Sequence, residues 1–221
     1  MNHHGIHNIT FILLFMGFIL PFYALAYDDK TTHPALTQEI IKFFNLLFPQ
    51  KKIADGDIAA IVQGSIDEDR DTRWLQHFYD PVYNRGLVLK EGATNKDFAV
   101  ISAGEHVEYE SSKNWAQNTK AQTGILGGLV AGITKSYFSG EEDYSWERSI
   151  YEYAWGDKRR GFESLGHTLH LLEDATVPDH TRNDPHPPIL NLGSPYEYWT
   201  RRFDIENIDL AENVKGEKPA L

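Results

Sequence analysis

The stretch GHTLHLLEDATVPDH, residues 166–180, gives the strongest indication of both the fold and the chemistry of this chain. His170 and Asp174 are four residues apart, so on a helix their side chains share one face and lie close enough to hold one ion. His180 follows just after Pro178, where the chain can turn back toward the first two side chains. Imidazole nitrogen and carboxylate oxygen are good zinc ligands. The stretch therefore predicts a helix that presents most of a metal site.

Apolar residues recur at helical spacing through most of the chain. The first helix is expected behind Pro34, which suits a first helical turn. Further helices are expected at residues 57–66, 95–122 with a break near Gly104, 145–155 and 158–177. The last of these has a predicted core-facing stripe made of Phe162, Leu165, Leu169, Leu172 and Thr176. Because no long alternating stretch or internal repeat is present, the predicted fold class is all-α, a multi-helix bundle.

Composition narrows the range of functions. The 221 residues are enough for one domain with a substantial core. The net charge of −11 argues against an electrostatic grip on nucleic acid, which needs Lys and Arg along the phosphates. The chain has no cysteine, which excludes disulfides and thiolate zinc sites. Ten histidines and thirty-two acidic residues are therefore the available metal ligands.

The N-terminus has the features of an export signal. Residues 11–20 are strongly apolar and are followed by Pro21 and an Ala-Leu-Ala cleavage pattern at residues 24–26. We expect residues 1–26 to be a signal peptide, after which Tyr27 becomes the first residue. The segment before the apolar run has no Lys or Arg, so an uncleaved anchor is the alternative. Either reading places the domain outside the cytoplasm, as a secreted or periplasmic protein.

Further candidate ligands lie upstream. The segment GSIDEDRDTRWLQHFYDP, residues 64–81, contains Asp67, Asp69 and Asp71 at alternate positions, and then His77. The glycine and the closing glutamate of an EF-hand loop are missing. Taken alone, the segment is also compatible with a solvated acidic loop. His33 stands at the start of the first expected helix.

Together these residues resemble the zinc-dependent phospholipase C and single-strand-specific nuclease superfamily, whose members are all-helical secreted hydrolases with a three-zinc cluster. The family order is matched by a histidine in TTHPALT, the second aspartate of IDEDRD and the histidine of HFYDP. It continues with the His-x-x-x-Asp pair of HLLED, the histidine of PDH and the glutamate of PYEYW. The resemblance implies one helical domain of this type over residues 27–205.

The resemblance implies a first zinc ion with four ligands, namely Asp69, His77, His170 and Asp174. Asp69 is preferred over its neighbour Asp67 for this position. It is also the implied catalytic residue, because it lies beside the attacking water and can help to take its proton.

The resemblance also implies a second and a third zinc ion. Asp174 would bridge to the second zinc, which His33 and the free amino group and carbonyl of Tyr27 would complete after signal cleavage. His180 and Glu197 would serve the third zinc.

The chain departs from the family pattern at three places. The first mature residue is Tyr27 where the family typically has tryptophan, but the ligands there are backbone atoms. Gly193 stands where the family has a histidine four residues before the glutamate, so the third zinc is expected to be weakly held or absent. Residues 206–221 form a polar C-terminal tail where related enzymes continue with further helices. This ending is compatible with a shortened protein or with a fragment.

Three functions are compatible with these residues. The first is a phospholipase C-like hydrolase that cleaves a phosphodiester with a metal-activated water. The second is a single-strand nuclease of the same superfamily, and the third is a secreted zinc-binding domain that has lost turnover. The expected cofactors are two zinc ions, with the third uncertain because of Gly193. The expected partners are a phospholipid or single-stranded nucleic acid substrate and, transiently, a membrane surface; no protein partner is predicted.

Overall fold

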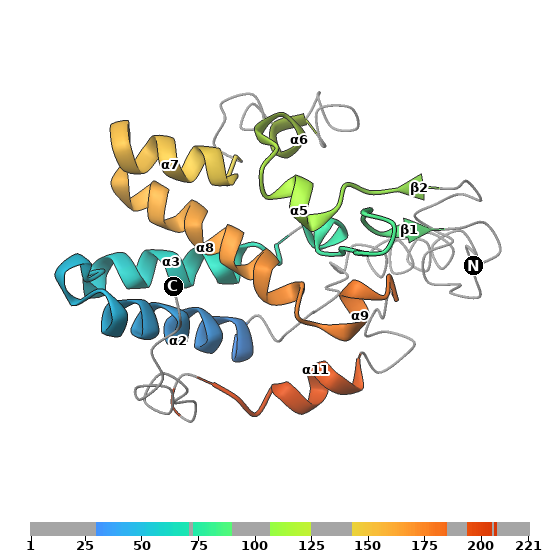
Figure 1. Ribbon diagram of the computed structural model, residues 1–221, viewed down its shortest axis with the longest axis horizontal. Coiled ribbons are helices and arrows are strands. Elements are labelled where there is room, and N and C mark those ends of the chain that lie inside the picture. The colour runs from blue at the N-terminus through green and yellow to red at the C-terminus, as the bar shows by residue number, and fades with distance from the viewer. Residues whose placement is uncertain are drawn as a thin grey trace, which may run out of the picture.

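The computed structural model describes residues 30–70, 73–89, 107–124, 143–184, 194–204 and 206, and helices dominate these residues (Figure 1). The predicted signal peptide, Tyr27, Gly193 and the tail after residue 206 lie outside the described residues. Within the described residues, no helix has the length and apolar character needed to cross a membrane.

Three long helices form the body of the domain. α2 (Thr32–Leu47) and α3 (Asp55–Asp67) pack side by side, and α8 (Lys158–Asp174) crosses α3 (Figure 1). α7 (Trp146–Trp155) packs on the N-terminal half of α8. The apolar cluster between the three long helices contains Ile41, Ala60, Ile61 and Phe162, with Ile53, Ile58, Leu165 and Leu169 packed against it.

Two glycines allow α3 and α8 to approach at backbone distance. A Cβ atom added at Gly64 would lie 1.9 Å from the carbonyl oxygen of Glu163, and one added at Gly166 would lie 1.9 Å from that of Ile61. Neither approach leaves room for a side chain, since non-bonded carbon and oxygen atoms do not come this close. The crossing therefore depends on glycine at both positions, and it brings the C-terminal half of α8 over the end of α3.

Shorter elements complete the described fold. These are η1 (Pro49–Lys51), η2 (Arg73–Gln76), β1 (Val88–Leu89), β2 (Val107–Glu108), α5 (Ser112–Trp115), α6 (Thr119–Gly124), α9 (Pro178–Thr181) and α11 (Pro195–Thr200). β1 and β2 form a small antiparallel pair. A second apolar cluster lies beside this pair and contains Trp74, Leu75, Phe78 and Leu87.

The prediction of a mostly helical, all-α class is confirmed, with the two-residue ladder as an addition. The prediction of helices over residues 95–122, with a break near Gly104, is wrong for residues 107–111, while residues 95–106 lie outside the described residues. At residues 107–111 the chain is extended, because Val107 and Glu108 pair with β1 and the Tyr109 amide donates to the Leu87 carbonyl. Helix begins only at Ser112, in α5.

The predicted core-facing stripe of α8 is correct at Phe162 and wrong at its C-terminal end. Leu172 is 62 % exposed and Thr176 is exposed, whereas Leu171 is buried. The reason is that the last turns of α8 bury a polar face, which carries His170, Glu173 and Asp174.

We predict that Gly166→Ala destabilises the protein, because the added methyl group must push α3 and α8 apart. Overpacking of this kind costs about 1–3 kcal/mol. Urea unfolding followed by circular dichroism measures the change. Gly56→Ala is the matched control, since Gly56 lies in the first turn of α3 with nothing within 4 Å of its added Cβ. That variant should be neutral or more stable by about 0.5–1 kcal/mol. Equal stability of the two variants would contradict the close crossing.

Candidate metal centre

Three buried side chains from α2 and α8 form the first group of potential ligands. His33, His170 and Asp174 each offer one ligand atom, and these atoms lie within 4.8 Å of one another. His33 Nε2 is 3.3 Å from Asp174 Oδ1. The imidazole rings of His33 and His170 stack with centroids 3.7 Å apart, and the Nε2 atom of each lies 3.3 Å from an oxygen of Asp174. The spacing of four residues that the sequence shows between His170 and Asp174 thus corresponds to adjacent side chains.

A second group shares His170 with the first. Its ligand atoms come from Asp69, His77 and His170, again within 4.8 Å of one another. Asp69 Oδ1 lies 3.6 Å from both His77 Nδ1 and His170 Nε2. Asp69 follows the end of α3, and His77 follows η2. The described fold therefore brings together residues that are about a hundred positions apart in the sequence.

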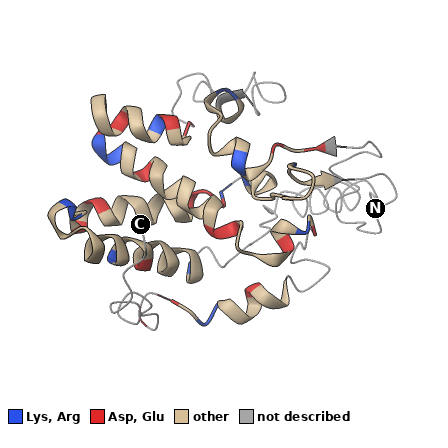
Figure 2. Ribbon diagram, in the orientation of Figure 1, with Lys and Arg blue, Asp and Glu red and all other residues tan. Residues whose placement is uncertain are grey.

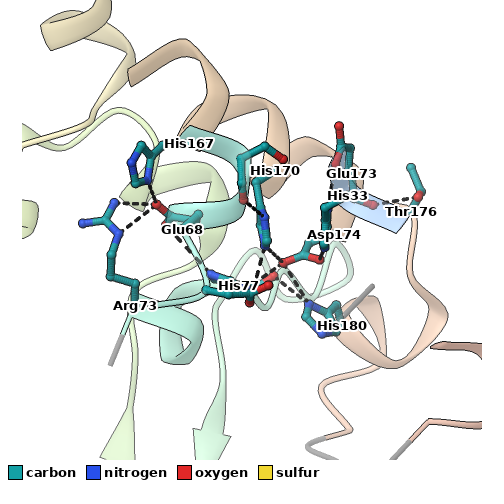
Figure 3. Close-up of polar contacts among 12 residues, drawn as sticks. His33, Glu68, Arg73, His77, His167, His170, Glu173, Asp174, Thr176 and His180 are labelled. Carbon is teal, nitrogen blue, oxygen red and sulfur yellow. Dashed lines mark hydrogen bonds and ion pairs between the residues drawn. The ribbon is translucent and has the colours of Figure 1, made fainter. Parts of the chain in front are cut away.

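Asp174 lies between the two groups (Figure 3). Its Oδ1 faces His33, and its Oδ2 lies 2.8 Å from His77 Nδ1 and 3.3 Å from His170 Nε2. Burial alone would raise the pKa of Asp174, but the neighbouring His180, His170 and His77 outweigh burial and hold the pKa well below its usual value. The side chain is therefore a carboxylate whose two oxygens point to different sets of imidazoles, as a bridging ligand requires.

Many polar atoms of this centre have no aligned hydrogen-bond partner. Among the described residues, these include both carboxylate oxygens of Asp69 and Asp174, both ring nitrogens of His77, and His170 Nε2. Buried polar groups in proteins are normally hydrogen-bonded, and an exception calls for an explanation such as a bound ion. Ring nitrogens and carboxylate oxygens that converge without aligned partners fit a metal cation.

Backbone and side-chain contacts fix the orientation of the histidines. The Nδ1–H of His170 donates to the carbonyl oxygen of Ser65 at 2.6 Å, which leaves Nε2 facing the centre. His33 Nδ1 lies 2.7 Å from Glu173 Oε2. Burial lowers the pKa of His33, but hydrogen bonds and charges from Asp174 and Glu173 outweigh burial and raise the pKa to about 10. The centre thus favours positive charge.

The predicted ligands of the third zinc ion lie at the edge of this centre. α8 ends at Asp174, and Pro178 begins α9, which turns His180 back so that its Nδ1 lies 3.6 Å from Asp174 Oδ2. His180 Nε2 is 3.8 Å from Oε1 of Glu197 on α11. Both side chains are buried. The structure therefore brings this pair together, while Gly193 lies outside the described residues.

The two neighbouring aspartates, Asp67 and Asp69, differ in their surroundings. Asp69 is buried and faces His77 and His170, whereas Asp67 is partly buried and pairs with Arg70 at 2.7 Å. Asp69 is thus the aspartate placed to bind an ion. Tyr27, the remaining predicted ligand, lies outside the described residues.

Sequence reasoning missed two buried glutamates, each directly before one of these aspartates. Glu173 contacts His33, and Glu68 forms a separate network beside the centre (Figure 3). The sequence feature that indicates these two glutamates is the Glu-Asp pair, which occurs both in IDEDRD and in HLLED.

Glu68 is fully buried, and the partly buried Arg73 supplies its counter-charge. Glu68 accepts hydrogen bonds from Arg73 Nε at 2.8 Å, Trp115 Nε1 at 2.9 Å and His167 Nδ1 at 2.5 Å. Tyr144 stacks on His167. Burial alone would raise the pKa of Glu68, but Arg73 and His167 outweigh it and keep the pKa well below its usual value. His167, three residues before His170 on α8, thus contacts Glu68 and not a metal-facing histidine.

Comparisons with protein-family models, curated proteins and solved structures find no match to this chain.

We predict that a divalent cation stabilises the folded protein through Asp174. A ligand at a concentration one hundred times its Kd adds about 2.7 kcal/mol to the free energy of unfolding. Thermal unfolding with added zinc, compared with unfolding in a chelator, measures this gain, and Asp174→Asn should lose most of it. Asp184→Asn, at an exposed position, should retain it. Identical unfolding of the wild-type protein with zinc and with chelator would contradict the metal centre.

We predict that Glu68→Gln costs about 3 kcal/mol of stability, because it leaves Arg73 without its buried counter-charge. Urea unfolding in the presence of chelator separates this effect from metal binding. Asp184→Asn serves again as the control, since its ion pair with Arg182 is exposed and should contribute under about 1 kcal/mol. A cost below 1 kcal/mol for Glu68→Gln would show that the network is not needed for stability.

Proposed function

We propose that this protein is a secreted or periplasmic zinc-dependent phosphodiesterase of the phospholipase C type. The observation that carries the proposal is the position of Asp174, whose two carboxylate oxygens face two ligand groups that share His170. One carboxylate between two sets of imidazoles is the donor arrangement of a centre with two metal ions. The residues that face Asp174 are those that the resemblance to the zinc-dependent phospholipase C and nuclease superfamily implies.

The donor set favours zinc over other common cations. Calcium and magnesium prefer oxygen ligands, whereas this centre offers imidazole nitrogens together with carboxylates. Zinc sites with histidine and aspartate ligands are common, and those that catalyse reactions leave a position open for water or substrate. His33 would belong to one ion, Asp69 and His77 to the other, and Asp174 to both.

Zinc ions bound at such a centre would make a water molecule nucleophilic near neutral pH and stabilise charge on a phosphodiester. The chain's own residues would contribute position and proton transfer. Asp69 is buried, and its oxygens have no aligned hydrogen-bond partner, so they can accept a proton from a water molecule held at the centre. Ser65 holds the ring of His170 in place through its carbonyl oxygen.

The charge of the chain favours a phospholipid over a nucleic acid as the substrate. The net charge is −11, and in Figure 2 the basic residues are scattered over several elements, the N-terminal end of α8 among them. The metal ligands His170 and Asp174 lie in the last turns of the same helix. Binding a polyanionic strand requires Lys and Arg along its path. A single phosphodiester headgroup needs only the local charge of the cations.

We predict that the protein expressed from Tyr27 binds about two zinc ions per chain and hydrolyses a phosphocholine ester and a phospholipid emulsion. Chelation and Asp174→Asn should both abolish turnover. Asp69→Asn should lower kcat by about 10²–10⁴-fold, the usual contribution of a general base. Asp67→Asn is the matched control, because Asp67 pairs with Arg70 and belongs to neither ligand group, and this variant should keep its activity.

The other outcomes separate the alternatives. Turnover of single-stranded DNA alone would favour a nuclease of the same superfamily. Stoichiometric zinc without turnover of any of these substrates would favour a zinc-binding domain. A folded protein that binds no zinc would reject the proposed function.

A further inference from the structure

Glu173 is a buried carboxylate next to the metal centre that the predicted ligand sets do not include. It directly precedes Asp174 on α8, and its side chain turns toward α2 (Figure 3). Its Oε2 lies 2.7 Å from His33 Nδ1, and its Oε1 accepts a hydrogen bond from Thr37 Oγ1 at 2.8 Å. Within the described residues, Glu173 makes no ion pair with Lys or Arg. The carboxylate of Glu173 therefore has His33 as its charged partner.

The contact determines which nitrogen of His33 faces the centre. A carboxylate can only accept hydrogen bonds, so Nδ1 must carry the proton and donate it to Glu173. This leaves Nε2 to face Asp174 Oδ1 at 3.3 Å, on the side where the first ligand group converges. Metal-binding histidines commonly donate their other N–H to a carboxylate, which fixes the ring and raises its basicity.

Glu173 also takes part in a chain of contacts between the two imidazoles of the first ligand group. Thr37 Oγ1 lies 2.9 Å from Ser65 Oγ, and the carbonyl oxygen of Ser65 accepts the Nδ1–H of His170. Glu173, Thr37 and Ser65 therefore form a continuous path between His33 on α2 and His170 on α8, by way of α3. Glu173 and Ser65 contact the two imidazoles directly, on the Nδ1 side of each ring, whereas the side-chain contacts of Thr37 are to Glu173 and Ser65.

The second buried glutamate provides a contrast. Glu68 also precedes a metal-facing aspartate, but Arg73, Trp115 and His167 occupy its oxygens. Its approach to a candidate ligand is to His77, whose Nε2 is 3.9 Å from Glu68 Oε1, which is beyond hydrogen-bond distance. Of the two glutamates, only Glu173 holds a ligand histidine directly.

We infer that Glu173 is a positioning residue that sets the affinity of the His33 side of the centre for its metal ion. This inference rests on the proposed function, because it requires that His33 binds a metal. A purely structural role, in which Glu173 only ties α8 to α2, would change stability without distinguishing the two metal ions.

Cobalt(II) and zinc titrations of the purified chain starting at Tyr27 test this inference. The visible spectrum of bound cobalt reports ligand geometry, and competition with a chelator gives the affinity of each equivalent. Glu173→Ala should weaken binding of the second metal equivalent, the ion on the His33 side, by about 10–100-fold. The affinity for the first equivalent should stay unchanged. Glu173→Gln keeps an oxygen acceptor for His33, so it should preserve the cobalt spectrum and lose less affinity than Glu173→Ala.

Thr37→Val is the matched control, because it removes the Thr37 contact of Glu173 while leaving the Glu173–His33 contact in place. It should keep both affinities even if its Tm falls. Wild-type affinity for both equivalents in Glu173→Ala would overturn the inference, as would equal losses in Glu173→Ala and Thr37→Val. If Glu173→Ala does not fold, the test depends on Glu173→Gln alone. In that case, wild-type affinity of Glu173→Gln for the second metal equivalent would overturn the inference. A wild-type protein that binds no metal would reject the proposed function itself, so the two failures are distinguishable.

Discussion

The carboxylate of Asp174 is the constraint on which the rest of this structure depends. It is completely buried, and an isolated buried charge costs several kcal/mol unless it is paired. Imidazoles from α2, α8, α9 and the segment after η2 surround it, so four separate parts of the chain must meet at one point. The arrangement of the helices follows from this requirement as much as from the burial of apolar side chains.

The close crossing of α3 and α8 meets this requirement. Gly166 lies four residues before His170, and its lack of a side chain lets the two helix backbones touch. At that distance the carbonyl oxygen of Ser65 reaches the ring of His170 and fixes its orientation. Glycine, histidine and aspartate at successive helical turns thus combine helix packing with ligand positioning. A wider crossing would leave the histidine without its hydrogen-bond partner.

Much of this centre follows from the sequence, because helical periodicity places residues four apart on one face. His170 and Asp174 could be paired in this way, and the family resemblance connected them with His33, Asp69 and His77. The exposure of Leu172 could not be foreseen, because hydrophobic periodicity assumes that the buried face of a helix is the apolar one. The roles of Glu68 and Glu173 were equally hidden, since a Glu-Asp pair does not reveal which way each side chain turns.

The balance of charge gives an independent reason to expect cations at this centre. Asp69, Asp174 and Glu173 bring three buried carboxylates together, and within the described residues none of them pairs with Lys or Arg. The raised pKa of His33, about 10 despite the opposing effect of burial, expresses the same demand for positive charge. Glu68 is excluded from this balance because Arg73 neutralises it. Divalent cations bound by neutral imidazoles would balance the negative charge of the remaining carboxylates. The need to balance the buried charge of Asp174 thus points to the same cations as the chemistry proposed for the protein.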